Sequence, residues 1–335
     1  MGTHKHFRKR IDEMQDEVAI KRIAIVVPCY NEEQVLPQSS TILIELFDNL
    51  KQSQHIHADS KIYFIDDGSQ DGTWEIIKSL SQSHSSISGI KLSRNYGHQS
   101  ALLAGLFSAE GDAVISIDAD LQDDVNIIKT MIDDFYKGKD IVYGVRGNRD
   151  TDSFFKRFSA KLFYKLMIIM GVDLIYNHAD FRLMSRRTVE HLMQYNESNL
   201  FIRGIIPLIG YPTSTVAYDR TERLAGESKY PLRKMLGFAI DGITSFSITP
   251  LRLITLLGIL ILLLSIVVSI WVLSVVFFST SAVPGWASTV LPIYFIGGIQ
   301  LFSLGIIGEY LGKIYLETKK RPRFTIEENT SDKNK

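Results

Sequence analysis

Residues 22–33 read Arg-Ile-Ala-Ile-Val-Val-Pro-Cys-Tyr-Asn-Glu-Glu, an apolar run that ends abruptly in polar residues. The apolar part predicts a strand buried on both faces, and residues 33–51 have the apolar spacing of an amphipathic helix. The same order of a strand followed by a helix is predicted at residues 62–66 and 72–83. Strands that alternate with helices predict an α/β domain whose mainly parallel sheet is covered on both faces.

Polar motifs follow three of the predicted strands. Further strands are predicted at residues 87–92 and 113–117, with a helix at residues 99–110 between them. Ligands of such sheets bind beyond the carboxyl ends of the strands. The motifs at these ends are Val27-Pro-Cys-Tyr-Asn-Glu-Glu33, Asp66-Asp-Gly-Ser-Gln-Asp-Gly-Thr73 and Asp118-Ala-Asp-Leu-Gln-Asp-Asp124. Each motif alone is also compatible with a turn or a solvated acidic loop, so it is their combination that predicts a binding site.

The third motif has the residue types of a divalent metal site. Asp118 and Asp120 are two residues apart, so on an extended segment their side chains point to the same side. Carboxylates are the ligands that Mg²⁺ and Mn²⁺ prefer, and such a cation would neutralise a departing diphosphate. No glycine-rich dinucleotide fingerprint follows the first strand, and no Walker lysine is found, which disfavours dehydrogenases and P-loop enzymes.

Charge and cysteine content exclude other classes of function. The chain has 37 Lys and Arg residues against 37 Asp and Glu residues, so a net charge of zero gives no bulk attraction to nucleic acid. Its single cysteine, Cys29, rules out an internal disulfide framework and a zinc site built of several thiolates.

Residues 253–308 carry no charged side chain and predict a membrane hairpin. Residues 253–278 and 289–308 are each long enough for a helix to cross a bilayer core of about 30 Å. Pro284, Gly285 and Trp286 lie between them and predict a turn with an interfacial aromatic ring. Glycines in the second segment permit close helix contacts and a homo-oligomer. The alternative is a buried hairpin in a soluble core, although such helices seldom run this long without a charge.

The distribution of basic residues predicts the orientation of this hairpin. The connecting loop has no Lys or Arg, whereas residues 313–335 form a basic tail. By the positive-inside rule the tail, and with it residues 1–250, faces the cytoplasm. Residues 1–20 form a highly charged polar arm without the apolar core of a signal peptide. The predicted parts are this arm, a soluble domain (21–229), an interfacial amphipathic helix (230–250), two transmembrane helices (251–312) and the cytoplasmic tail.

Taken in order, the three polar motifs and Arg94-Asn-Tyr-Gly-His-Gln99 resemble those of the inverting family 2 glycosyltransferases, which have the GT-A fold. The hairpin and the ending Gly308-Glu-Tyr-Leu-Gly-Lys313 narrow the resemblance to bacterial polyprenyl-phosphate glycosyltransferases, relatives of dolichol-phosphate mannose synthase. The resemblance implies a multi-pass enzyme of the bacterial plasma (inner) membrane. Such an enzyme moves one sugar, with inversion, from a nucleotide sugar such as UDP-glucose or UDP-N-acetylglucosamine to undecaprenyl phosphate. Its product serves the modification of cell-wall or surface glycans.

The resemblance also implies roles for the matched residues. Those of the nucleotide-sugar site are Pro28, Tyr30, Glu32, Asp66, Asp67, Arg94, Gln99 and Asp118. Asp118, Asp120 and Gln122 are the implied ligands of Mg²⁺ or Mn²⁺. Asp180, in Asp180-Phe-Arg-Leu183, takes the place of the catalytic carboxylate, together with Asp120. For Arg94 and Gln99, helix capping and packing is an equally good interpretation.

A polyprenyl phosphate places its anionic head at the membrane surface, so the enzyme needs cations there. Residues 154–170 mix aromatic, aliphatic and basic side chains, which is typical of an interfacial helix. The resemblance implies that Arg146, Arg157, Ser159, Arg223 and Lys229 hold the lipid phosphate. Non-specific contact of these cations with anionic lipid is the alternative. A phosphate monoester with a second pKa of about 6 needs little help from a base. Asp180 is therefore interpreted either as a base or as a positioning group.

Three rival functions differ in what they require of the sequence. A processive polysaccharide synthase carries a Gln-x-x-Arg-Trp motif, which this chain lacks, and two helices are too few for its channel. A non-catalytic lipid-binding scaffold has no use for the donor-side ligands Asp118 and Asp120. A polyprenyl-phosphate mannose synthase that uses GDP-mannose stays open, because the sequence does not place the contacts that select the sugar.

Overall fold

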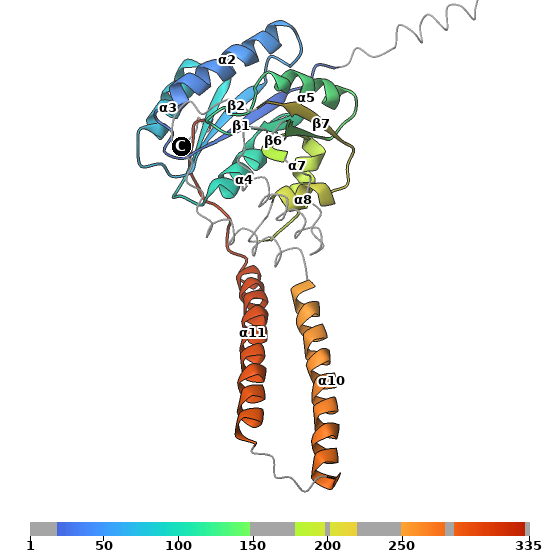
Figure 1. The fold of residues 1–335 in the computed structure, drawn as a ribbon. Coiled ribbons are helices and arrows are strands. Elements are labelled where there is room, and N and C mark those ends of the chain that lie inside the picture. Colours follow the sequence, from blue (N-terminus) through green and yellow to red (C-terminus); the bar gives the residue numbers. More distant parts are fainter. Residues whose placement is uncertain (1–18, 148–177, 198–201, 220–248, 279–284, 332–335) are drawn as a thin grey trace, which may run out of the picture.

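An eight-stranded mixed sheet forms the centre of the soluble domain (Figure 1). The computed structural model describes residues 19–147, 178–197, 202–219, 249–278 and 285–331. Along the sheet the strands are ordered β7-β5-β6-β4-β1-β2-β3-β8. In chain order they are β1 (Ile23–Cys29), β2 (Lys61–Asp66), β3 (Ile87–Leu92), β4 (Ala113–Ser116), β5 (Ile141–Arg146), β6 (His178–Ser185), β7 (Thr213–Tyr218) and β8 (Ile326–Asn329).

Most neighbouring strands run parallel, so the predicted α/β architecture is confirmed. β1 pairs in parallel with β2 and β4, and β2 with β3, whereas β6 and β8 are antiparallel to their neighbours. The helices of the soluble domain are α2 (Leu36–Gln52), α3 (Thr73–Ser83), α4 (His98–Ser108), α5 (Ile127–Tyr136), α7 (Arg186–Met193) and α8 (Ile202–Leu208). Helix α2 begins later than the predicted residue 33, because backbone and side chain of Glu33 bind the loop after β2.

Two apolar cores cover the two faces of the sheet. Helices α2, α3 and α5 pack on one face through side chains such as Leu43, Ile77 and Ile132. Helices α4, α7 and α8 pack on the other face, where Leu103 and Ile205 are buried. The helices α10 (Thr249–Phe278) and α11 (Trp286–Thr318) extend from the side of α8 as two long rods (Figure 1). The sheet is therefore buried between helical layers.

Helices α10 and α11 occupy the segments predicted to cross the membrane. They contain 30 and 33 residues, whereas about 20 helical residues span a bilayer core. Within the described parts of the chain, one stretch, Phe295–Thr318, is long and apolar enough to cross a membrane by length and composition. A shorter apolar stretch covers Thr249–Ile261. The helical character of both segments is confirmed, and two membrane crossings stay a prediction.

The chain after α11 returns to the soluble domain as β8. This strand pairs with the edge strand β3, and Glu328 accepts a hydrogen bond from the indole N–H of Trp74 (3.3 Å). Lys78 forms an ion pair with the same carboxylate at 3.1 Å. The sequence predicted a basic tail from residue 313. Instead, α11 continues to Thr318, and β8 is an integral strand of the sheet.

Candidate active site

The loops that follow β1 and β2 are joined by hydrogen bonds at the carboxyl edge of the sheet. The N–H of Asn31 donates to the Ser69 hydroxyl (2.9 Å), and the Asn31 side-chain oxygen accepts from the N–H of Gln70 (2.9 Å). The N–H of Glu32 donates to the Thr73 hydroxyl at 2.8 Å. The predicted nucleotide-site residues Pro28, Tyr30 and Glu32 therefore lie beside the motif that begins at Asp66.

Asp66 and Asp67 are both buried, and burial raises the pKa of each carboxyl. The Asp67 carboxylate accepts hydrogen bonds from the backbone N–H groups of Tyr96 (2.8 Å) and Gly97 (2.9 Å). It thereby holds the loop before α4, which also contains Arg94. Asp67 is predicted to bind the nucleotide, and the structure adds that it orders this neighbouring loop.

The loop that contains Arg94 makes a close backbone contact with Gly68, in the loop that follows β2. Gly68 has φ +68°, and a Cβ atom there would lie 2.4 Å from the carbonyl carbon of Arg94. Only glycine fits this approach without a backbone shift. The Arg94 guanidinium stacks over the Tyr96 ring at 4.3 Å from the centroid. Gln99 lies in the first turn of α4, close in the chain to the loop that Asp67 holds.

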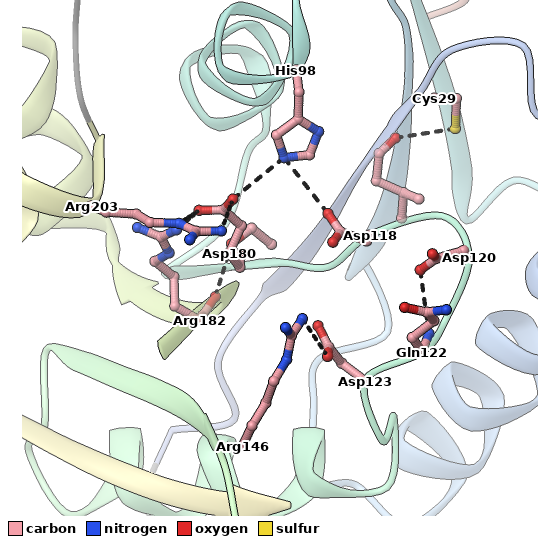
Figure 2. A network of polar contacts seen from close by, with 12 residues as sticks. Cys29, His98, Asp118, Asp120, Gln122, Asp123, Arg146, Asp180, Arg182 and Arg203 are labelled. Atoms are coloured by element: carbon pink, nitrogen blue, oxygen red, sulfur yellow. Dashed lines mark hydrogen bonds and ion pairs between the residues drawn. The ribbon is translucent and has the colours of Figure 1, made fainter. Parts of the chain in front are cut away.

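The acidic loop, residues 118–124, is a turn and not an extension of the strand. β4 ends at Ser116, so the prediction that strand geometry aligns Asp118 and Asp120 is wrong. The N–H of Leu121 donates to the carbonyl of Asp118 (3.3 Å), and the N–H of Gln122 donates to the Asp120 carboxylate (3.3 Å). Leu121 has φ +43°, a conformation that a non-glycine residue adopts at a cost. This turn keeps the three predicted metal ligands in one loop (Figure 2).

The charges around the acidic loop suit a divalent cation. Burial raises the pKa of Asp118, and the negative charges of Asp180, Asp123 and Asp120 raise it further against the opposing effect of His98. Among the described residues, no three His, Cys, Asp or Glu side chains form a metal site by themselves. Mg²⁺ is commonly held by one or two carboxylates together with substrate phosphates, so Asp118, Asp120 and Gln122 fit such an ion.

The antiparallel pairing of β6 with β4 brings Asp180 beside the acidic loop. Arg182 of β6 pairs with the Asp180 carboxylate and is fully buried. Arg203, from α8, donates to both carboxylate oxygens, at 3.1 Å from Nε and 2.8 Å from Nη2. Nε2 of His98 lies 3.6 Å from an oxygen of Asp180 and 3.6 Å from an oxygen of Asp118 (Figure 2). The imidazole at the start of α4 thus bridges the two carboxylates.

The surroundings of Asp180 keep it ionised. Burial alone would raise its pKa, but the charge of Arg182, the contact with His98 and the pairing with Arg203 hold the pKa well below its ordinary value. Burial also lowers the pKa of the His98 imidazole, whereas the contact with Asp180 and the charge of Asp118 raise it overall. A carboxylate with such a low pKa is a poor proton acceptor at neutral pH.

Arg146 lies at the end of β5, on the same edge of the sheet. Its guanidinium forms an ion pair with the buried carboxylate of Asp123, with 3.3 Å between Nη2 and Oδ1. The predicted acceptor cation therefore lies next to the acidic loop (Figure 2). The other predicted acceptor residues, Arg157, Ser159, Arg223 and Lys229, are outside the described residues. So are residues 1–18 of the polar arm, the interfacial segment 154–170 and residues 230–248 of the predicted interfacial amphipathic helix.

Besides Arg182, which belongs to the Asp180 motif, three residues of this site were not predicted from the sequence. His98 belongs to the Arg94–Gln99 motif, where its position between two capping candidates was the only signal. Asp123 follows the predicted metal ligands directly, and Arg203 has no motif of its own. Their partners come from distant parts of the chain, so only the strand order brings them together.

Comparison with known proteins finds relatives that match most of the chain. The profile of the family described as "Glycosyl transferase family 2" matches residues 24–193. The "uncharacterized glycosyltransferase YkoT" of Bacillus subtilis is 52% identical over 308 residues, which cover 91% of each chain. The "bactoprenol glucosyl transferase" of Shigella phage SfX is 42% identical over 306 residues, 91% of this chain and 98% of the phage protein. A solved structure, mannosyltransferase PcManGT from Pyrobaculum calidifontis with GDP-Man and Mn²⁺, aligns over 95% of this chain and 93% of its own, with 14% identity and a TM-score of 0.44.

Proposed function

Because this chain belongs to glycosyl transferase family 2, we propose that it transfers glucose from UDP-glucose to undecaprenyl phosphate. The observation that carries the proposal is the position of His98. Its imidazole contacts both Asp118, the predicted donor-side carboxylate, and Asp180, the predicted catalytic carboxylate. The choice of glucose and of the lipid acceptor is supported by the relatives named bactoprenol glucosyl transferase, which this chain matches over nine tenths of its length.

In the proposed reaction an oxygen of the lipid phosphate attacks the anomeric carbon of the sugar. A new carbon–oxygen bond forms to the lipid phosphate, the bond to the β-phosphate of UDP breaks, and the bond electrons leave with UDP. Attack from the opposite side inverts the configuration. A divalent cation held by Asp118, Asp120 and Gln122, Mg²⁺ or Mn²⁺, would supply charge neutralisation for the leaving diphosphate. The loops that carry Tyr30, Asp66 and the Arg94 motif hold the nucleotide.

Asp180 acts in this scheme as a positioning group and not as a base. Its low pKa makes it a weak acceptor of protons, and the acceptor phosphate is mostly ionised at neutral pH without a base. Arg182 and Arg203 fix the carboxylate from two sides, so it offers a rigid acceptor for a hydroxyl group of the sugar. Rigid placement of reacting groups supplies a large part of enzymatic rate acceleration.

On the acceptor side, Arg146 contacts the acidic loop through Asp123. Its position lets the guanidinium bind the lipid phosphate while the acidic loop holds the donor diphosphate. Arg157, Ser159, Arg223 and Lys229 remain predicted partners of the same phosphate. Two anionic substrates at one edge of the sheet require cations close to them. Arg146 beside Asp123 and Arg203 beside Asp180 support this arrangement.

The return of the chain as β8 supports a membrane hairpin. The soluble domain precedes α10, and the strand that follows α11 is part of the same sheet. Both ends of the hairpin therefore lie on the side of the catalytic domain. Together with the positive-inside rule, this supports an enzyme of the bacterial plasma membrane that faces the cytoplasm and crosses the membrane twice.

Labelling of single cysteines tests this orientation. In a Cys29→Ser background, Gly285→Cys at the start of α11 is expected to react with a membrane-impermeant maleimide in intact cells. Lys320→Cys, just after α11, is expected to react only after permeabilisation, because it lies on the cytoplasmic side. Equal reactivity of both positions in intact cells would refute the hairpin.

A panel of donors tests the proposed reaction. Purified protein in detergent is incubated with undecaprenyl phosphate, Mn²⁺ and radiolabelled UDP-glucose, UDP-N-acetylglucosamine or GDP-mannose. Label from UDP-glucose is expected in the organic phase. Label from another donor instead would correct the sugar, and the absence of lipid-bound label from every donor would reject transfer to the lipid.

A further inference from the structure

Asp123 connects the acidic loop to Arg146 and Tyr218. Its side chain is only 2% exposed. The phenol of Tyr218 donates a hydrogen bond to Oδ1 of Asp123 at 2.6 Å, and Nη2 of Arg146 lies 3.3 Å from the same oxygen. Nε of Arg146 also donates to the Tyr218 hydroxyl, at 3.4 Å. The three side chains form a closed triangle at the edge of the sheet.

Strand register places two corners of this triangle. Arg146 and Tyr218 are directly paired residues at the ends of the parallel strands β5 and β7. The Tyr218 ring packs edge-on against Phe181, with centroids 5.7 Å apart, and Phe181 follows Asp180 in β6. The third corner, Asp123, comes from the loop after β4. Contacts therefore run from the acidic loop to Arg146 and, through Tyr218, to the strand that carries Asp180.

The charges of the triangle are mutually dependent. A buried carboxylate needs hydrogen-bond donors or a counter-charge, and Tyr218 and Arg146 provide both. Burial raises the pKa of Tyr218, and the bond to Asp123 raises it further, so the phenol stays a donor at neutral pH. The contacts to Asp123 and Tyr218 orient Arg146, and within the described part of the chain they use two of the five N–H donors of the guanidinium.

We propose that Asp123 and Tyr218 are positioning residues that hold the Arg146 guanidinium for the acceptor phosphate at a fixed place beside the acidic loop. This inference rests on the proposed function, because it assumes that Arg146 binds the lipid phosphate. The triangle then sets the spacing between the donor diphosphate and the acceptor phosphate. An error in this spacing is costly, because displacement of a reacting group by about 1 Å slows catalysis by about 100-fold.

Direct binding of the lipid tests the inference without donor, metal or turnover. The affinity of the full-length protein in detergent is measured for undecaprenyl phosphate and, as the control ligand, for undecaprenol, which lacks the phosphate. Tyr218→Phe keeps the ring against Phe181 and removes only the hydroxyl. It is expected to weaken binding of undecaprenyl phosphate about 10-fold, the lower end of the loss seen when a metal ligand loses its orienting partner, and to leave undecaprenol binding unchanged.

Asp123→Asn is expected to weaken phosphate-dependent binding at least as much, and Asp124→Asn in the same loop is the matched control with unchanged affinity. Arg146→Ala measures the whole contribution of the guanidinium. Since Tyr218 acts through Arg146, adding Tyr218→Phe to Arg146→Ala should cause no further loss. If Asp123→Asn unfolds, Tyr218→Phe alone tests the inference, because phenylalanine preserves the packing of the ring against Phe181.

The outcomes separate this inference from the proposed function. If Arg146→Ala weakens phosphate-dependent binding but Tyr218→Phe does not, the positioning role is wrong and the assignment of Arg146 stands. If Arg146→Ala also leaves binding unchanged, Arg146 does not bind the acceptor and the positioning role falls with it. In transfer assays, a raised KM for undecaprenyl phosphate with an unchanged KM for UDP-glucose would support the inference.

Discussion

Asp180→Asn is expected to lower kcat for sugar transfer by about 100-fold, the loss typical of a misplaced reacting group. Asparagine keeps the shape of the side chain but loses the charge that holds Arg203 and the fully buried Arg182. The measurement is steady-state transfer of label from UDP-glucose to undecaprenyl phosphate. A kcat within threefold of the wild-type value would contradict the central position of Asp180 in the site.

The pH profile distinguishes a positioning role of Asp180 from a role as base. A carboxyl with a lowered pKa stays ionised from neutral pH into mild acid, so its protonation does not limit the rate there. The acid limb of the profile is then expected near pH ~6, from the second ionisation of the acceptor phosphate. The residual activity of Asp180→Asn should show the same limb. Loss of this limb in the variant would identify Asp180 as the titrating base.

Unfolding is a second route by which Asp180→Asn can lose activity, because loss of one partner of a buried ion pair costs about 3–5 kcal/mol of folding free energy. A second variant, Arg203→Gln, therefore perturbs the same carboxylate without breaking the buried pair. Arg203 is 36% exposed, and its removal leaves the pair of Asp180 and Arg182 intact. This variant is expected to unfold near the wild-type temperature but to transfer sugar more slowly, because the carboxylate loses the partner that contacts both of its oxygens.

Asp120→Asn is expected to lower transfer by at least about 100-fold at saturating donor, since a metal ion contributes several kcal/mol to stabilising the leaving group. The amide oxygen can still accept the N–H of Gln122, so the turn of the acidic loop is preserved. The apparent affinity for Mn²⁺, measured by titration in the presence of UDP, should fall in parallel.

Asp124→Asn is the matched control for Asp120, because it changes a carboxylate of the same loop whose partner among the described residues is the neighbouring Asn126. Activity and Mn²⁺ affinity of this variant should equal those of the wild type. Equal losses in Asp120→Asn and Asp124→Asn would show that the loop, and not a metal ligand, had been damaged.

The sequence predicted the alternation of strands and helices and the three polar motifs at one edge. These predictions succeed because apolar runs such as residues 22–28 and their polar ends are local signals. The glycosyltransferase family also followed from motifs such as the one at Asp66. The long uncharged segments that make up most of α10 and α11 were equally clear local signals for helices.

Long-range pairing could not be predicted from local patterns. The antiparallel insertion of β6 next to β4 places Asp180 beside Asp118, and only the strand order reveals it. The same holds for Arg203, whose partner lies 23 residues away in the chain, and for β8, which the sequence presents as part of a basic tail. The turn at Leu121 differs from the predicted extension of the strand, because strand periodicity does not describe a loop with positive φ.

Counting both products of one reaction shows whether the acceptor is a lipid phosphate. Labelled UDP-glucose is incubated with the enzyme and either undecaprenyl phosphate or undecaprenol, and released UDP is compared with label in the organic phase. We expect one glucose in the lipid fraction per UDP released, with undecaprenyl phosphate only. Release of UDP that is independent of undecaprenyl phosphate, or without label in the lipid, would contradict this expectation.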